Sequence, residues 1–435
     1  MKAKIKYKIL NMRYLIVIGL LFSLNVNGQK LEEYLLIASK NNSEIKAAYT
    51  EFEIAMQKSP QVKSLPDPTL TLSAFGRMVE TRVGAQEARF SIMQMFPWFG
   101  TLAAKENVAN LLAEAAFQKY VDTKNEVLLN VKKMYAEFYE LHKMINLEEQ
   151  NLQILETYRI LSLSKFQNGN GAMVDVVRID IKRNESSTDI ELLKEQYNPL
   201  QIGFNSMLNV GLNEPINHID SLPLNDISLE KYTDDLFDSN PKLVVLDKKK
   251  KAYESQKLIE KKEGLPMIGI GLDYSIISKR DVPDLEMNGQ DAIMPMLTLT
   301  LPIFRKKYKA AQKEVELMIK GTEYEKEAIQ NNLKATYSMS AFNFQKAKKL
   351  RELYLKQIEA TQQAIKLLLA AYSNSGSNFE EILMMNQDLL MLKTAIITAN
   401  KNQFTYKRTT LAPDPSNQRI VLSIDRLNLP SSSKA

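Results

Sequence analysis

Two kinds of hydrophobic spacing alternate along the chain and divide it into long helices and short strands. Residues 100–165 carry apolar side chains at steps of three and four, and no proline or glycine occurs between Gly100 and Asn168. Residues 303–372 have the same spacing. The pattern predicts two helices of about 66 and 70 residues, each followed by a helix of about half that length, at 173–208 and 377–411. A further helix is predicted over residues 31–56, and another begins at Asn240.

A strict alternation of polar and apolar residues predicts four strands in two hairpins. The first pair covers residues 69–74 and 88–96 on either side of Gly84, and the second covers residues 267–278 and 292–301 around a polar loop. Each strand therefore has one apolar and one polar face. Such strands fit a membrane barrel with lipid outside and water inside, and they also fit the two-faced sheet of a soluble protein.

The same order of elements occurs twice. Leu-Pro precedes the first strand of each hairpin, at 65–66 and 265–266, and Phe-Pro-Trp-Phe at 96–99 corresponds to Leu-Pro-Ile-Phe at 301–304. The turn regions that follow the two long helices also match. The sequence predicts two copies of helix, hairpin, long helix, turn and return helix. Their predicted bounds are 29–209 and 240–411, with an irregular segment at 210–239 and a tail at 412–435.

The N-terminal segment has the features of a secretory signal peptide. Basic residues precede the apolar run 14–24, and a small residue, Gly28, precedes a plausible cleavage point. Removing its five basic residues from the 57 Lys and Arg leaves 52, against 51 Asp and Glu. This balance gives no support for nucleic-acid binding. The chain has no cysteine, which excludes disulfides and an N-terminal lipid anchor on a thiol.

Beyond residues 1–28, no apolar run approaches the roughly eighteen residues of a membrane-spanning helix. Entry into a membrane would therefore require strands. Four strands cannot close into a barrel, and an open edge in lipid leaves backbone groups unpaired. The chain would have to oligomerise, and these arguments leave a dimer and a trimer equally open.

Together, the leader, the two-fold repeat, the Leu-Pro and Phe-Pro-Trp-Phe-Gly motifs and the paired turns resemble the TolC-like outer membrane efflux proteins. Within that family, Leu65-Pro66-Asp67-Pro68 is most similar to the heavy-metal and cation efflux branch. The resemblance implies a mainly α fold with a small β part. In a homotrimer, a twelve-stranded barrel would lie in outer-membrane lipid and a tunnel of twelve helices in the periplasm. It also implies a periplasmic adaptor and an inner-membrane transporter of the resistance-nodulation-division type as partners. Many relatives carry a lipidated cysteine after the leader, where this chain has Gln29.

Candidate functional residues lie at the turns and at the junctions between strand and helix. Acidic residues after the turns could line a cation-selective aperture, although acids also suit the first turn of any helix. Small residues in the turns could admit an adaptor, although they also suit tight turns. Aromatic residues and prolines at the junctions suit a membrane interface. The aperture candidates are Asp175, Glu380 and Glu381; the adaptor-docking candidates are Asn168, Gly169, Asn170, Gly171, Ser375, Gly376, Ser377 and Asn378; the junction candidates are Pro97, Trp98, Pro302 and Phe304.

Other chemistry is sparse. His142 and His218 are the only histidines, so no metal site of the usual transition-metal type is expected. Methionines recur in close pairs, which suggests a relay for soft metals but is better explained by packing; the pairs are Met93 with Met95, Met294 with Met296, and Met384 with Met385. Phosphate loops and nucleophile motifs are absent, so neither an enzyme nor a cofactor is predicted. The predicted function is an efflux duct, and the alternative is a soluble periplasmic coiled-coil scaffold or adaptor.

Overall fold

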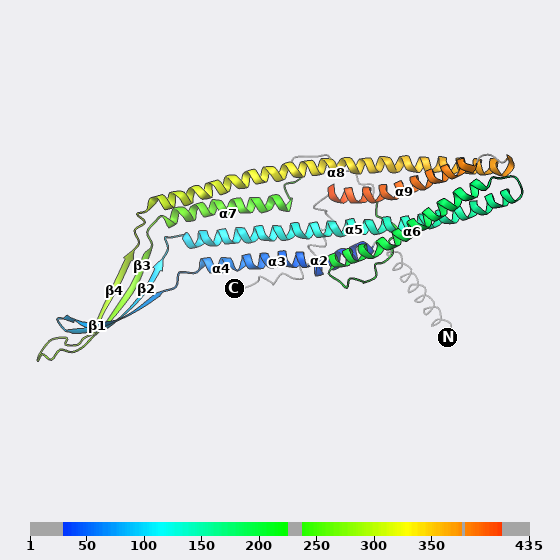
Figure 1. Ribbon diagram of the computed structural model, residues 1–435. Coiled ribbons are helices and arrows are strands. Elements are labelled where there is room, and N and C mark those ends of the chain that lie inside the picture. Colours follow the sequence, from blue (N-terminus) through cyan, green and yellow to red (C-terminus); the bar gives the residue numbers. More distant parts are fainter. Residues whose placement is uncertain (1–28, 225–236, 376–378, 411–435) are drawn as a thin grey trace, which may run out of the picture. The chain divides into compact units, whose positions relative to one another are not determined.

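The computed structural model describes residues 29–224, 237–375 and 379–410 (Figure 1). These residues form two compact units. Unit 1 draws on Met1–Lys46, Thr123–Thr233 and Leu333–Ala435, and unit 2 on Ala47–Asp122 and Asp234–Asn332. The predicted signal peptide, the tail from residue 412 and part of the irregular segment expected at 210–239 lie outside the described residues.

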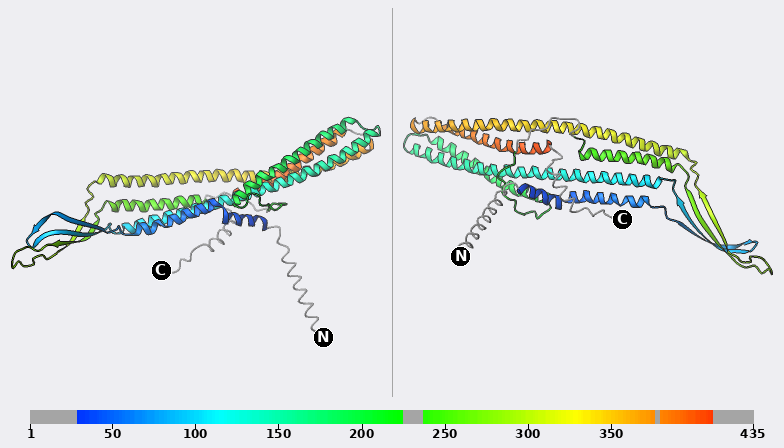
Figure 2. Two further views of the ribbon diagram at one scale, coloured as in Figure 1. Left: turned by 60° about the horizontal axis from the view of Figure 1, so that its bottom comes forward. Right: turned by 180° about the vertical axis from the view of Figure 1, so that it is seen from behind.

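Unit 2 contains one antiparallel sheet of four strands in the order β1-β2-β3-β4. The strands follow one another side by side in both views of Figure 2. Their bounds are β1 Thr69–Thr81, β2 Gly84–Phe96, β3 Ile268–Ile277 and β4 Ala292–Leu299. The two hairpins predicted from the alternation are therefore present, and they join through the pairing of β2 with β3. The first hairpin is longer than predicted because β1 continues to Thr81, past an irregularity between Ala74 and Val79.

Ion pairs connect neighbouring helices of unit 2, in addition to buried apolar and aromatic contacts. These helices are α4 (Lys58–Lys63), α7 (Pro241–Glu263), most of α3 (Ser43–Met56) and the first parts of α5 (Thr101–Gln167) and α8 (Arg305–Ser375). Lys250 and Lys257 of α7 bind Glu323 and Glu316 of α8 at 2.7 and 2.9 Å. The lysine run 248–251, which reads as a solvated helix face, thus contributes to helix pairing. Exposed pairs of this kind are each worth at most about 1 kcal/mol.

Unit 1 combines the later parts of α5 and α8 with α2 (Gln29–Asn41), α6 (Met173–Leu208) and α9 (Phe379–Thr410). An aromatic cluster packs α2 and α6 on α5. The ring of Tyr34 lies 5.1 Å from Phe204, and Phe204 lies 5.5 Å from Phe138. Both phenylalanines are fully buried. The aromatic rings anchor this end of the unit because each removes a large apolar area from water.

The helix predicted over residues 31–56 is two helices, because Asn42 interrupts it. Its side-chain oxygen accepts hydrogen bonds from the backbone of Glu44 and Ile45, at 2.9 and 3.1 Å, and so caps α3. Its amide nitrogen donates to Met207 O at 2.8 Å, at the C-terminal end of α6. The break therefore satisfies backbone groups on two elements at once, a role that helical spacing alone does not reveal.

The long helices match the predicted spacing closely. α5 has 67 residues and α8 has 71, and the return helices α6 and α9 have 36 and 32. Among the described residues, one helix, Phe379–Lys407, is long and apolar enough to cross a membrane by length and composition. No uninterrupted apolar run indicated it, since Asp388 and Lys393 lie within it. Phe379 and Ile382 are nevertheless buried inside unit 1, as in the core helix of a bundle.

Candidate functional site

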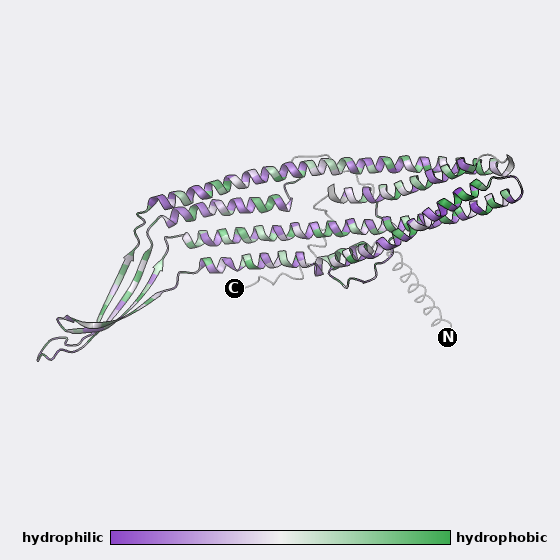
Figure 3. Ribbon diagram, viewed as in Figure 1, coloured by the Kyte–Doolittle hydropathy of each residue, from purple (hydrophilic) through white to green (hydrophobic). Residues whose placement is uncertain are grey.

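One face of the sheet is apolar and exposed. Cross-strand partners share a face, and the rows that start at Leu70 and Leu72 continue through apolar residues on β2, β3 and β4. Leu72 is 64% exposed and Leu297 is 79% exposed. Figure 3 shows hydrophobic and hydrophilic residues alternating along the strands. The residues of this face, called the apolar face below, are Leu70, Leu72, Phe90, Ile92, Ile270, Leu272, Tyr274, Ile293, Pro295, Leu297 and Leu299.

The opposite face carries hydroxyl, charged and thioether side chains. Asp273 lies in the middle of this polar face with only 4% of its surface exposed, and Ser91 Oγ hydrogen-bonds to its carboxylate. Arg89 lies on the same face, one row further along. A sheet with one apolar and one polar face can separate an apolar medium from water.

The outer strands of the sheet have free edges. Within the described residues, β1 and β4 each pair with one strand only. Thr300 N donates to Met267 O at 3.0 Å, so the N–H of Thr300 points toward the side of β3. Along a strand, successive N–H groups point alternately to the two sides, so those of even-numbered residues point toward β3 and those of odd-numbered residues point away from it. The nitrogen of Pro295 therefore faces away from β3. Proline is tolerated there because the ladder with β3 does not need its missing N–H. The β4 edge therefore remains available for pairing, with one donor absent.

Exposed apolar residues also mark the junctions between strands and helices in unit 2. Trp98 packs edge-on against Phe99 with ring centroids 6.0 Å apart, and Phe99 and Phe304 are 77% and 78% exposed. Gly100 has a φ of 75°, which allows the chain to turn into α5. The candidates Pro97, Trp98, Pro302 and Phe304 all lie where strand becomes helix. Phe99, the neighbour of Trp98, also has a largely exposed ring. The sequence-based list of junction candidates did not include it, although it belongs to the Phe-Pro-Trp-Phe motif.

In unit 1, the turn between α5 and α6 is built by residues 168–171. Gly169 adopts a φ of 75°, and Asn170 N donates to Lys165 O at 2.9 Å, so the last carbonyls of α5 are satisfied. A Cβ on Gly171 would lie 3.1 Å from the backbone nitrogen of Phe166. Small residues are thus required here for the turn itself. In the second turn, Ser375 ends α8, while Gly376, Ser377 and Asn378 lie outside the described residues.

Next to these turns, an apolar cluster joins α5, α6, α8 and α9 of unit 1. Phe379 and Ile382 of α9 are at most 1% exposed and pack with residues of the other three helices. The ring of Tyr372 lies 5.0 Å from Phe379, and Lys165 Nζ lies 4.5 Å from the Tyr372 ring. This packing holds the helix ends that carry the acidic candidates. The other members of the cluster are Leu155, Tyr158, Ile179 and Leu383.

Two of the three acidic candidates, Asp175 and Glu380, lie near each other, and Arg178 lies beside them. Arg178 Nη1 lies 2.9 Å from Glu380 Oε2, which links α6 to α9. Burial raises the pKa of Asp175, Arg178 lowers it, and the nearby Glu380 raises it. Glu381 is exposed in the first turn of α9. Sequence reasoning missed Arg178, although its place three residues after Asp175 puts it on the same helix face.

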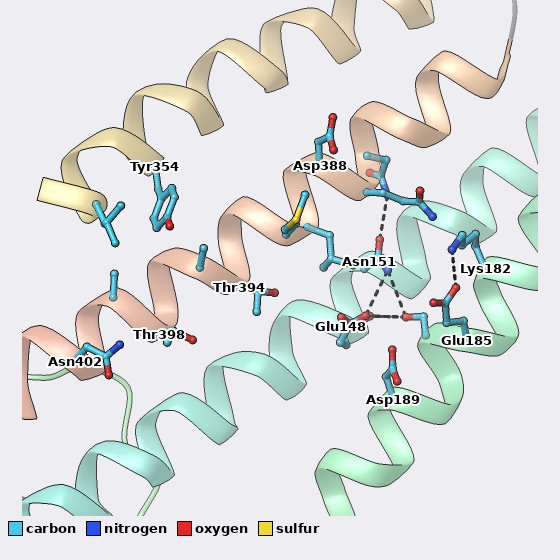
Figure 4. Close-up of a pocket in the computed structure, with 18 of the residues that line it drawn as sticks. Glu148, Asn151, Lys182, Glu185, Asp189, Tyr354, Asp388, Thr394, Thr398 and Asn402 are labelled. Carbon is cyan, nitrogen blue, oxygen red and sulfur yellow. Dashed lines mark hydrogen bonds and ion pairs between the residues drawn. The ribbon is translucent and has the colours of Figure 1, made fainter. Parts of the chain in front are cut away.

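A cavity of about 830 Å³ lies within unit 1, lined by α5, α6, α8 and α9 (Figure 4). Glu148 stands at its floor and accepts a hydrogen bond from Ser186 Oγ at 3.0 Å. Asn386 donates to Asn151 Oδ1 at 3.0 Å and extends the network to α9. Burial raises the pKa of Glu148, and the hydrogen bonds from Ser186 and Asn151 lower it. No sequence motif indicated this cavity, because its lining comes from four separate helices.

The two histidines, far apart in the sequence, contact each other in unit 1 with their ring planes tilted by 39°. The rings of His142 and His218 have centroids 4.2 Å apart, and His218 Nε2 lies 3.0 Å from Asp220 Oδ1. Burial, and then His218, lower the pKa of His142. Among the described residues, no group of three or more His, Asp or Glu side chains is placed to hold a metal ion.

No protein-family model matches this sequence, and no curated protein matches it. Solved structures do match. The outer membrane protein VceC of Vibrio cholerae is 13% identical, with a TM-score of 0.72 over 88% of this chain and 95% of VceC. CusC, whose structures are described in connection with transmembrane channel formation, is 12% identical, with a TM-score of 0.76 over 90% and 95%. The open-state MtrE outer membrane channel of Neisseria gonorrhoeae is 15% identical, with a TM-score of 0.70 over 88% of both chains.

These likenesses concern the fold. They confirm the predicted class, mainly α with a small antiparallel sheet, in the architecture shared by these outer membrane proteins. The similarity extends over almost the whole of this chain and of the chains it resembles. No adaptor is among the solved structures named here.

Proposed function

We propose that this protein is the outer-membrane channel of a tripartite efflux system. In this proposal three copies form the channel, which passively conducts substrates delivered by an inner-membrane pump and a periplasmic adaptor to the cell exterior. The sheet lies in outer-membrane lipid and the helices lie in the periplasm. The pump is of the resistance-nodulation-division class. The fold and the sequence motifs at both hairpins support this assignment over a soluble scaffold or adaptor.

The observation that carries the proposal is the four-stranded sheet with an exposed apolar face and two free edges. In water such a face and such edges would promote aggregation. In lipid, the apolar face is solvated, and pairing β4 of one copy with β1 of the next satisfies the edges. Three sheets of four strands would give a barrel of twelve strands, an even number like that of bacterial single-chain outer-membrane barrels.

The turn residues fit contact with the adaptor. Asn168, Gly169, Asn170 and Gly171 form the turn at one end of unit 1. Ser375, Gly376, Ser377 and Asn378 are proposed as the corresponding adaptor contact between α8 and α9. An adaptor's helical hairpin could approach such a surface closely because few long side chains obstruct it. The junction residues Pro97, Trp98, Pro302 and Phe304, together with Phe99, would lie at the membrane surface, where aromatic rings collect.

The acidic residues fit a cation-selective aperture that Arg178 moderates. In a trimer, Asp175, Glu380 and Glu381 would each occur three times around the narrow end, and rings of carboxylates favour cations. Arg178 compensates one of these charges in each copy. Replacing Asp175 or Glu381 by Ala should lower cation selectivity in single-channel recordings. Unchanged selectivity in both variants would exclude these residues from the aperture.

Fractionation and gel analysis test the proposal as a whole. The mature protein should need detergent for extraction from the outer membrane, run as a heat-sensitive trimer, and form conducting pores in planar bilayers. A monomer that stays in solution without detergent would refute the channel. Such a result would restore the soluble scaffold as the better explanation.

Crosslinking tests the proposed pairing of β4 with β1. Because the chain has no cysteine, introduced thiols are unique. Single cysteines at Leu70 or Leu72 on β1, combined with one at Leu297 or Leu299 on β4, should yield covalent dimers and trimers on oxidation. Pairs placed on β2 and β4, which are not neighbours in the sheet, are the control and should not link copies. Failure of all four β1–β4 combinations would contradict the edge pairing.

A further inference from the structure

Four methionines gather on the polar face of the sheet. Met93 and Met95 lie on β2, and Met294 and Met296 lie on β4. Their rows adjoin one another. Met93 is opposite Gly271, which is opposite Met296; Met95 is opposite Gly269; and Met294 is opposite Asp273. The strand between the two methionine pairs therefore has glycine at the positions where side chains would keep the pairs apart.

The β2 thioethers occupy the space that these glycines leave open. A Cβ on Gly269 would lie 2.5 Å from Met95 Sδ and 3.1 Å from Met93 Sδ. A Cβ on Gly271 would lie 3.0 Å from Met93 Sδ. The two sulfur atoms are thus no farther apart than the sum of the first two distances, and both lean across β3 toward the strand that carries Met294 and Met296. Any other residue at 269 would displace them.

A carboxylate adjoins the sulfur atoms. Asp273 lies one row from Met93 on the same face, directly opposite Met294, and is held by Ser91 Oγ. Met93, Met95 and Met296 are half-buried, and Met294 is 51% exposed. The thioethers are therefore grouped beside one carboxylate and remain accessible from the polar side, while Arg89 lies one row beyond Asp273 on the side away from Met93 and Met95.

Packing is the usual role of methionine, but this face offers little for it to pack against. The neighbours of the four thioethers on the polar face are Thr69, Ser91, Thr298 and, one row beyond Met95, Met267; the leucines and isoleucines lie on the opposite face. Thioethers are soft ligands that bind Cu(I) in preference to hard cations. We propose that Met93, Met95, Met294 and Met296, with Asp273 beside them, form a binding site for a soft monovalent cation such as Cu(I) or Ag(I).

The evidence for the site comes from the geometry of the sheet alone. Its placement in the bore of a channel, where each trimer would hold three copies, rests on the proposed function. There it would retain a soft cation in transit through several weak thioether contacts, since conduction requires sites that also release their ion.

Silver binding tests the site, because Ag(I) needs no reductant. The detergent-solubilised mature protein is dialysed against silver nitrate in chloride-free buffer, and bound silver is measured by elemental analysis. Replacing all four methionines by Leu, which conserves volume, should weaken silver binding at least about tenfold. The control replaces four exposed methionines outside the cluster, Met173, Met318, Met339 and Met391, and should bind silver like the unchanged protein. Equal binding by the cluster variant, or an equal loss in the control, overturns the proposal.

X-ray absorption on the silver-loaded, unchanged protein provides a second readout that does not depend on a variant that folds. Sulfur neighbours around silver support the site, and oxygen or nitrogen neighbours alone overturn it. Dialysis and absorption need no working pore, so they can succeed or fail independently of the bilayer recordings. In those recordings, silver should lower the potassium conductance of the unchanged protein and not that of the cluster variant. Silver that binds at the cluster without affecting conductance would overturn the placement in the bore.

Discussion

The apolar residues of the sheet in unit 2 are exposed, whereas those at the helix ends in unit 1 are buried. In the unit 1 cluster, Phe379 and Ile382 are buried to within 1% of their surface, whereas Leu72 and Ile293 of the sheet are 64% and 65% exposed. Burying one such side chain stabilises a protein by about 1.5–3 kcal/mol. Unit 1 gains this energy within a single chain. The sheet leaves these side chains exposed within a single copy. Under the proposed function, lipid and the other copies would cover them.

The largest effect is expected from a substitution in the buried cluster of unit 1. Phe379→Ala should lower the free energy of unfolding of unit 1 by roughly 3–5 kcal/mol, because it removes a fully buried ring. Hydrogen exchange should show faster exchange in α9 and at the end of α5. Met391→Ala, on the same helix but 63% exposed, is the control and should change stability by less than about 0.5 kcal/mol. Similar small effects in both would mean that the cluster does not stabilise the unit.

The second prediction concerns the exposed apolar face of the sheet. Leu72→Lys places a charge on the apolar face and should cost roughly 2–4 kcal/mol in each chain if the residue lies near the middle of the bilayer. The heat-sensitive trimer should then be reduced in outer-membrane fractions. Thr71→Lys is matched in depth but faces the polar side, so it should assemble normally. Equal assembly of both variants would show that the apolar face does not contact lipid.

A third, smaller effect concerns Glu148 on the polar floor of the unit 1 cavity. Burial raises its pKa, so the folded state binds the proton more tightly than the unfolded chain does. The free energy of unfolding therefore falls as the pH rises from the pKa of glutamate in the unfolded chain to the higher pKa in the folded state. Above that pH, the folded protein stays less stable by this amount. Glu148→Gln, which keeps the acceptor for Ser186, should be more stable than the unchanged protein at about pH 7 and should lose this advantage below about pH 4. Denaturant titrations at both pH values would measure this, and a gain that does not depend on pH would contradict it.

The smallest effect on stability is expected from the ion pair behind the turns. Arg178 and Glu380 are 42% and 47% exposed, so Arg178→Gln should destabilise unit 1 by less than about 1 kcal/mol. Cation selectivity should nevertheless increase, since a positive charge next to Asp175 and Glu380 is lost. Single-channel reversal potentials measure this. The control is Arg159→Gln, which removes a different ion pair, between Arg159 of α5 and Asp180 of α6. A shift of equal size in both variants would indicate a general charge effect.

Much of the architecture could be predicted because it depends on local periodicity. The alternation from Thr69 to Ala74 fixes which side chains share a face, and the unbroken spacing after Gly100 requires one long helix. The break at Asn42 could not be predicted in this way, since it becomes favourable only when the end of α6 supplies Met207 O as an acceptor. The turn residues 168–171 were predicted as a turn, while their contact with an adaptor stays a prediction.

The sequence by itself determined the helices, the strands, their two faces and the absence of cysteine chemistry, because these depend on neighbouring residues and on composition. Only the tertiary structure decided that Arg178 meets Glu380, that the ring of His142 contacts that of His218, and that Met93 and Met95 lean over the glycines of β3 toward Met294 and Met296. Those meetings depend on strand register and helix neighbours. Both are selected by the free energy of packing the whole chain, to which residues hundreds of positions apart contribute together.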